Sequence, residues 1–209
     1  DVCSSDLVPT RVWKNALPGL RGVLAAARTH GEADFLVYGD ERVSFDAFHR
    51  AVAALSAALA ARGVAKGDRV ALAMRNLPEW PVAFMAVAAL GAIIVPLNAW
   101  WTGEELAFAL EDSGAKLLIA DSDRWMRIAA HAAGLPLAGA VVSRGAAEGA
   151  ERLEDLIGAP ASWADLPDAE LPFAQIHSDD PVGIFYTSGT TGKPKGALGT
   201  HRNLVTNIM

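Results

Sequence analysis

The feature that most constrains the fold is a regular alternation of helical and extended patterns that begins at Ser44. The stretch 44–63 carries apolar residues at helical spacing, with Ser44 as the predicted N-cap and Gly63 as the predicted end. Extended segments alternate with helical patterns and are predicted at 68–75, 92–97, 115–121 and 139–144. Because strands separated by helices build right-handed crossovers, we predict an α/β fold with a mainly parallel, helix-covered sheet.

The helices between these strands have recognisable starts. One is predicted to begin at Pro78, the next follows Thr102, and a third runs through Trp125 and His131. His49 and His131 therefore lie in predicted helices, where a partly exposed structural role is expected, and the sequence contains no metal-ligand cluster.

The chain divides into parts of different character. Residues 8–144 are predicted to form a first α/β subdomain. The segment 145–171 is acidic, rich in Ala, Gly and Pro and weakly periodic, which is typical of a connector. Residues 172–209 are expected to begin a second subdomain, with a short strand at 182–186 and a last helix after Thr200.

Both ends of the sequence suggest a piece of a longer protein. The opening 1–7, DVCSSDL, resembles the translation of a sequencing-adapter oligonucleotide, so we expect it not to belong to the natural protein. The last helix reaches Met209 without a stop signal. We therefore expect a partial N-terminal domain, cut before its sheet system is complete.

Composition excludes several classes of protein. With 209 residues and 52% hydrophobic content, the chain is long enough to bury a core. A formal net charge of −6, without a basic run, argues against a nucleic-acid binder. Cys3 is the single cysteine, so no internal disulfide is expected and a reducing, cytoplasmic setting is favoured.

The uncharged stretch 80–103 is long enough to span a bilayer. Pro81, Gly91 and Pro96 interrupt it, and its composition changes from helix formers to β-branched residues. These interruptions favour a buried helix, a turn at Gly91 and a buried parallel strand over a transmembrane helix, and they leave peripheral membrane association open. Trp100 and Trp101, after this strand, are expected to pack rather than to stack on a ligand.

The segment 184–198, IFYTSGTTGKPKGAL, has the composition of a phosphate-binding loop. Glycines let the backbone approach oxyanions, hydroxyls donate hydrogen bonds and lysines supply positive charge. It is not a Walker A loop, because two residues rather than four separate Gly189 from Gly192 and because Pro194 follows Lys193. The alternative is a flexible linker or a hairpin turn, which the apolar flanks and the Lys-Pro-Lys ending disfavour.

YTSGTTGKPKG closely resembles the phosphate-loop signature of the adenylate-forming (ANL) superfamily, which includes acyl-CoA synthetases, peptide-synthetase adenylation domains and luciferase. Residues 67–98 and 105–121 also resemble the N-terminal region of acyl-CoA ligases, so the resemblance covers 34–209, with 145–171 least specific. It implies a reaction in which a carboxylate attacks the α-phosphate of Mg²⁺-ATP, and the acyl group of the resulting adenylate then passes to coenzyme A.

The resemblance also assigns residues. Those implied to hold the phosphates of ATP or to shape the loop are Thr187, Ser188, Gly189, Thr190, Thr191, Gly192, Lys195 and Gly196. Lys193 occupies a position that varies in the signature and is treated as auxiliary. The catalytic and metal-binding residues of the family lie beyond this sequence, so we expect none here and expect the chain alone to be inactive.

Two other functions stay open at this stage. A peptide-synthetase adenylation domain would carry the same loop, and it is distinguished by a carrier-protein domain that follows. A non-catalytic nucleotide-binding module is the second alternative.

Overall fold

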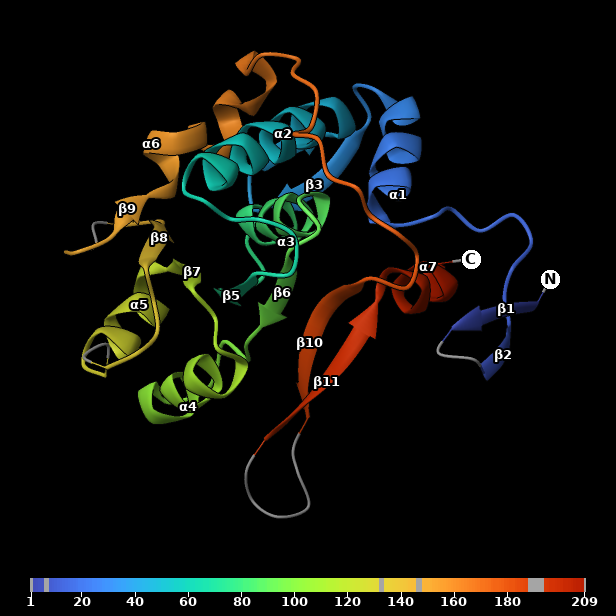
Figure 1. Ribbon diagram of the computed structural model, residues 1–209. Coiled ribbons are helices and arrows are strands. Elements are labelled where there is room, and N and C mark those ends of the chain that lie inside the picture. Colours follow the sequence, from blue (N-terminus) through green and yellow to red (C-terminus); the bar gives the residue numbers. More distant parts are fainter. Residues whose placement is uncertain (1, 6–7, 132–133, 146–147, 188–193, 209) are drawn as a thin grey trace.

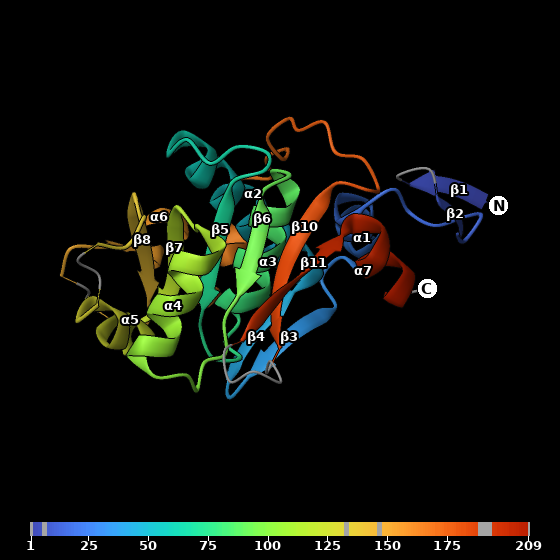
Figure 2. The same cartoon turned by 60° about the horizontal axis from the view of Figure 1, so that its bottom comes forward.

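The computed structural model describes residues 2–5, 8–131, 134–145, 148–187 and 194–208. Its centre is a seven-stranded sheet in the order β11-β10-β6-β5-β7-β8-β9, in which β11 is antiparallel to β10 and every other neighbouring pair is parallel (Figures 1 and 2). The predicted α/β class and the mainly parallel, helix-covered sheet are confirmed.

The sheet strands are β5 (Arg69–Ala73), β6 (Ile93–Pro96), β7 (Leu117–Asp121), β8 (Gly139–Ser143), β9 (Glu151–Arg152), β10 (Pro181–Thr187) and β11 (Lys195–Thr200). Two separate antiparallel pairs are β1 (Val2–Ser5) with β2 (Val8–Arg11) and β3 (Asp34–Tyr38) with β4 (Glu41–Ser44). The helices are α1 (Leu20–Ala27), α2 (Phe45–Ala61), α3 (Glu79–Ala89), α4 (Gly103–Ser113), α5 (Ser122–Ala129), α6 (Leu153–Ile157) and α7 (His201–Ile208), with short 3₁₀ turns η1 (Arg28–His30) and η2 (Pro160–Asp165).

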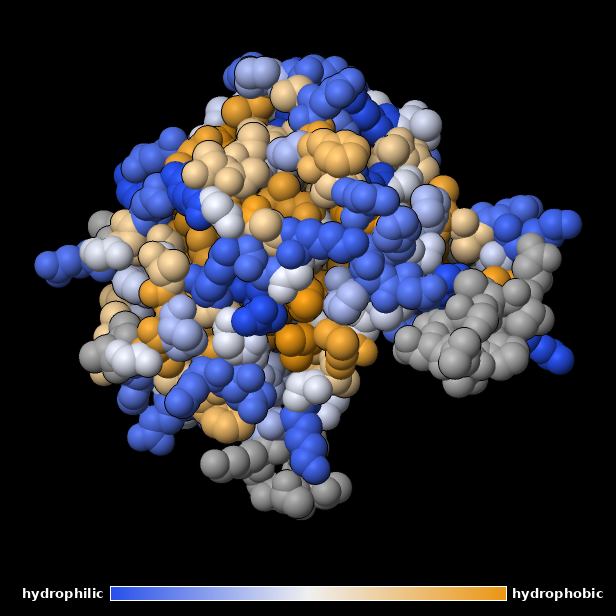
Figure 3. Space-filling view, in the orientation of Figure 1, coloured by the Kyte–Doolittle hydropathy of each residue, from blue (hydrophilic) through white to orange (hydrophobic). Residues whose placement is uncertain are grey.

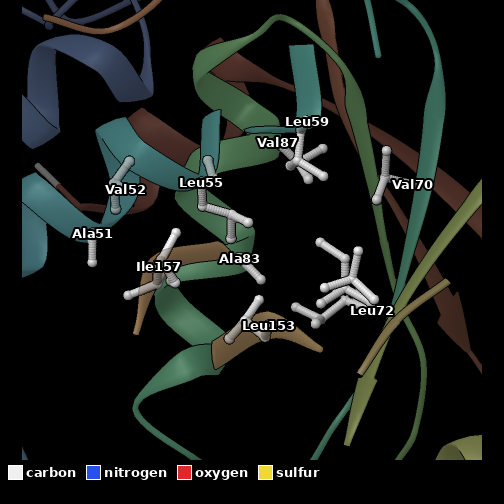
Figure 4. Packing of buried hydrophobic residues seen from close by; sticks show 14 of the residues in the cluster. Ala51, Val52, Leu55, Leu59, Val70, Leu72, Ala83, Val87, Leu153 and Ile157 are labelled. Atoms are coloured by element: carbon white, nitrogen blue, oxygen red, sulfur yellow. The ribbon is translucent and has the colours of Figure 1, made fainter. Parts of the chain in front are cut away.

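Alternation along β5 explains why helices cover both faces of the sheet. Val70 and Leu72 point into a core cluster that also contains residues of α2, α3 and α6 (Figure 4), whereas Ala71 and Ala73 belong to a second cluster with residues of α4 and α5. All four side chains are fully buried. Because helices cover both faces of the sheet, a central parallel strand such as β5 is apolar on both faces.

Local capping sets the helix starts as the sequence predicts. The Ser44 hydroxyl accepts a hydrogen bond from the Ala47 amide at 3.2 Å. Thr102 and Glu105 form a reciprocal capping box at the start of α4. The predicted caps at Ser44 and Thr102 are therefore confirmed, and Gly63, with φ of 79°, follows the end of α2.

The uncharged stretch 80–103 has the predicted buried arrangement. It contains helix α3, a turn at Gly91 with φ of 71°, and the buried strand β6. Among the described residues, no helix is both long and apolar enough to cross a bilayer.

Several elements differ from the sequence prediction. The helix through Trp125 ends at Ala129 and does not include His131, and His49 is buried rather than partly exposed. The predicted connector 145–171 contains β9, α6 and η2, and it buries Leu153, Ile157 and Trp163 in the core. Strands β10 and β11 join the same sheet as β5 to β9, and the division into subdomains stays a prediction.

His201, the first residue of α7, is a buried polar residue that links α7 to α1. Its Nδ1 accepts a hydrogen bond at 3.3 Å from the amide of Leu20, the first residue of α1, and its Nε2 has no hydrogen-bond partner among the described residues. Burial lowers the pKa of His201; the charge of Asp180 opposes this shift and that of Lys66 adds to it. The imidazole is thus held neutral, because a protonated Nδ1 could not accept from Leu20.

We predict that acidification destabilises the contact between α1 and α7. A histidine whose pKa is lower in the folded than in the unfolded state stabilises the fold above its unfolded pKa, and this contribution is lost as the pH falls below it. Urea unfolding between pH 7 and 5.5 should show the free energy of unfolding decreasing by at most about 1.4 kcal/mol per pH unit from this group. This decrease in the free energy of unfolding should be smaller in His201→Gln than in the control His30→Gln, which makes the same change at an exposed histidine. Equal slopes in the two variants would contradict the assignment.

Candidate functional site

The candidate phosphate loop connects the two strands of a β-hairpin. Strands β10 and β11 pair in antiparallel register, and the last pair before the loop is Thr187 with Lys195. The hairpin alternative raised by the sequence is therefore correct for the connectivity, and it is compatible with a loop that binds phosphate. Five of the residues assigned to the site lie outside the described residues, namely Ser188, Gly189, Thr190, Thr191 and Gly192, as does Lys193.

The hairpin end lies at the edge of the sheet where ligands bind in open α/β folds. Because β10 is parallel to β6, its carboxyl end points the same way as the carboxyl ends of β6, β5 and β7. Ligands bind outside the carboxyl ends of parallel strands in folds of this kind. Figure 3 shows hydrophilic and hydrophobic residues side by side along the lower part of this face.

Thr187, Lys195 and Gly196 are the assigned site residues that the structure describes. Thr187 and Lys195 are exposed on paired strand ends, and Lys195 forms no ion pair with any described residue. An ammonium group without a carboxylate partner is available to an anionic ligand. The structure thus brings a hydroxyl and a cation together at the mouth of the loop.

Gly196 lies in β11 opposite Tyr186, rather than in the loop itself. A Cβ atom at position 196 would stand 2.6 Å from Cγ2 of Ile184, a distance that side chains do not tolerate. The glycine is therefore required here by packing across the hairpin, in addition to any freedom it gives the loop.

Tyr186 joins this hairpin to helix α4. Its hydroxyl lies 2.6 Å from Oδ2 of Asp112 and 3.3 Å from the carbonyl of Ala109, and its ring meets that of Trp101 edge-on at 6.0 Å. Burial first, and then the hydrogen bond to Asp112 and the charge of that carboxylate, raise the pKa of Tyr186, so the hydroxyl remains a donor at neutral pH. The sequence prediction missed this contact, because Tyr186 and Asp112 are far apart along the chain.

A buried ion pair organises the neighbouring loops. Asp121 and Arg124 are almost inaccessible to solvent and contact each other at 3.1 Å. Asp121 also accepts from the amide of Arg75 at 2.9 Å, and Arg124 donates to the carbonyl of Ala99 at 2.8 Å. The chain segments that leave β5, β6 and β7 are thereby tied together. A signal for this pair was present, since Asp121 is both the end of a strand and the N-cap of α5.

Two adjoining cavities of about 380 and 280 Å³ lie beside these segments and share Tyr38 and Asn76. Trp100, at the smaller cavity, is 72% exposed, and the guanidinium of Arg75 lies 5.1 Å from the centre of its ring. The prediction that both tryptophans pack is therefore right for Trp101 and wrong for Trp100.

Metal binding is not supported by the described side chains. Within the described ranges, no three His, Cys, Asp or Glu residues lie close enough to hold a metal ion. We therefore assign no ligand of Mg²⁺ to these residues.

A family model described as AMP-binding enzyme matches residues 23–209. The chain belongs to the AMP-binding enzyme family. It is 36% identical over 183 residues to a feruloyl-CoA synthase of Amycolatopsis, covering 88% of this chain and 33% of the relative. It is 38% identical over 148 residues to the long-chain-fatty-acid–CoA ligase FadD13 of Mycobacterium tuberculosis, covering 70% of this chain and 27% of the relative. The chain thus spans about a third of the length of the curated relatives it matches.

Solved structures of this family have the same arrangement. The anthranilate CoA ligase AuaEII in complex with anthranoyl-AMP superposes with a TM-score of 0.79 at 26% identity, over 91% of this chain and 36% of that protein. The inhibitor-bound N-terminal domain of FACL13 from Mycobacterium tuberculosis superposes with a TM-score of 0.72 at 30% identity, over 88% of this chain and 45% of that domain. The fold is therefore that of the N-terminal region of an adenylate-forming enzyme.

We predict that Gly196→Ala destabilises the hairpin through Ile184. The added methyl group would overlap Cγ2 of Ile184, and overpacking of this kind costs about 1 to 3 kcal/mol. Removing the clash with Ile184→Ala should abolish the extra cost of the alanine at 196, which a double-mutant cycle of unfolding free energies measures. Additive effects of the two substitutions would show that the clash is absent.

Proposed function

We propose that this chain is part of an acyl-CoA ligase that activates a carboxylic acid with ATP and transfers the acyl group to coenzyme A. The observation that carries the proposal is the hairpin end at the carboxyl edge of the sheet, where the Gly-, Ser- and Thr-rich segment is flanked by Thr187 and by Lys195, which has no ion-pair partner among the described residues. Membership of the AMP-binding family and the names of its CoA-ligase relatives support it. We infer that the 209-residue chain alone does not turn over, because it spans about a third of those relatives.

The proposed task of these residues is to manage the charge of the polyphosphate. When the carboxylate attacks the α-phosphate, negative charge collects on the departing pyrophosphate. The Lys195 ammonium and the Thr187 hydroxyl offer charge-assisted hydrogen bonds to that group. The proposal extends the same role to the assigned residues outside the described ranges, which are Ser188, Gly189, Thr190, Thr191 and Gly192. Mg²⁺ would also neutralise phosphate charge, and no step is assigned to it on the described side chains.

We predict that Lys195→Ala and Thr190→Ala slow adenylate formation in the complete enzyme encoded by the gene of this chain. Isotope exchange between pyrophosphate and ATP, which depends on the carboxylic acid, measures this step without coenzyme A. Losing one contact to a charged group costs about 1.5 to 3 kcal/mol, so each variant should lose about tenfold or more in exchange rate.

The matched control is Lys14→Ala, which removes an exposed lysine before α1 and should exchange at the wild-type rate. Unchanged exchange in both Lys195→Ala and Thr190→Ala would refute the phosphate role. The 209-residue chain by itself should show no exchange above the background.

A further inference from the structure

The sheet supports β10 along only part of its length. Gly183 pairs with Ile94 of β6, and continuing this register sets Phe185 beside Pro96, the last residue of β6. Proline has no amide hydrogen to donate. The amide of the following residue, Leu97, donates to Leu72 of β5 at 2.9 Å, away from β10. The carboxyl-terminal residues of β10 therefore extend past the end of β6, the strand with which the first half of β10 pairs.

Beyond that point the chain turns away from β10. The carbonyl of Asn98 accepts a hydrogen bond from the Trp101 amide at 3.1 Å, and its side chain accepts one from the Trp100 amide at 2.9 Å. These bonds close a turn that leads into α4. Main-chain pairing with β6 thus ends before the residues that flank the candidate loop, and those residues need support from another source.

Helix α4 supplies this support through the Tyr186 side chain. The hydroxyl reaches Asp112 Oδ2 at 2.6 Å, a short bond to a carboxylate. The helix is itself firmly placed, because its start is held by a capping box and because Leu106, Ala109 and Leu110 on its inner face are fully buried. In Figure 1 α4 lies beside the lower end of β10, where this contact is made.

Tyr186 is well placed to control both sides of the loop. It directly precedes Thr187 along the chain. It also pairs with Gly196, the residue that directly follows Lys195. Thr187 and Lys195 are in turn paired with each other. Fixing the phenol ring relative to α4 therefore constrains the backbone of Thr187 and Lys195 relative to the sheet.

We propose that Tyr186 and Asp112 are positioning residues that hold the strand ends of the phosphate loop in the orientation needed to bind the polyphosphate of ATP. This inference rests on the proposed function for its ligand. The mechanical part, a tether between β10 and α4, is independent of it. Two arms of one experiment separate the two parts.

The first arm measures steady-state kinetics in the complete enzyme. Tyr186→Phe and Asp112→Ala should each raise KM for ATP by about tenfold, with KM for the carboxylic acid changed by less than about twofold, because a positioning effect acts on the group that is positioned. Asp112→Asn keeps an oxygen that can accept from the phenol and should restore KM for ATP to within about threefold of wild type. The double variant should equal either single variant, since both remove the same hydrogen bond.

The matched control for Asp112→Ala is Asp165→Ala, the same change at an exposed carboxylate in η2, which should leave both KM values unchanged. A merely structural contact would lower Tm in Tyr186→Phe without a selective change in KM for ATP. That result, or a failure of Asp112→Asn to restore KM, would overturn the positioning role.

The second arm measures hydrogen exchange in the 209-residue chain without any nucleotide. Amides of 184–187 and 195–198 should exchange faster in Tyr186→Phe and Asp112→Ala than in wild type, and at the wild-type rate in Lys195→Ala. If the tether is real but Lys195→Ala leaves pyrophosphate exchange unaffected, the proposed function fails and the tether stands. Suppose instead that Lys195→Ala impairs pyrophosphate exchange, while Tyr186→Phe and Asp112→Ala change neither KM for ATP nor the protection of these amides from hydrogen exchange. The positioning proposal then fails and the proposed function stands.

Discussion

The parallel pairing of β10 with β6 is the constraint on which the candidate site depends. It sets the direction of β10, and so it places the hairpin end at the same edge as the carboxyl ends of β5, β6 and β7. An antiparallel strand at this position would carry the same sequence to the opposite edge. The loop composition alone is therefore insufficient, because the glycines and hydroxyls act on a ligand only where the topology brings other strand ends beside them.

The carboxyl edge is stiffened by buried charge. Asp121 and Arg124 are paired with little access to water; Asp121 also accepts from the Arg75 amide, and Arg124 also donates to the Ala99 carbonyl. A buried pair of this kind contributes little net stability, since desolvation offsets the attraction, but it strongly disfavours other loop arrangements once one partner is in place. The loops after β5 and β6 are consequently fixed before any ligand arrives, and Trp101 is held where it can contact Tyr186.

Most of the fold could be predicted from the sequence because its signals are local. Ser44 and Thr102 cap helices through contacts within one turn, and the apolar segments of β5 and β7 are short and punctuated. The elements that were missed depend on distant partners. Strand β11 contains two glycines and is recognisable as a strand only through its pairing with β10, and the contact of Tyr186 with Asp112 joins residues 74 apart in sequence. The exposure of Trp100 was mispredicted for the same reason, since burial depends on which neighbours the fold supplies.

A hairpin and the proposed phosphate site are compatible interpretations of the segment between β10 and β11. A hairpin supplies two strand ends that are paired to each other, so the backbones of Thr187 and Lys195 are held at a fixed separation without any further contact. What pairing cannot supply is a fixed direction relative to the rest of the sheet, because a two-stranded ribbon that extends beyond its neighbours can bend and twist. The contact between Tyr186 and α4 restricts that freedom. In the proposed site, the hairpin therefore contributes the spacing of the two strand ends, and the side-chain tether contributes their orientation.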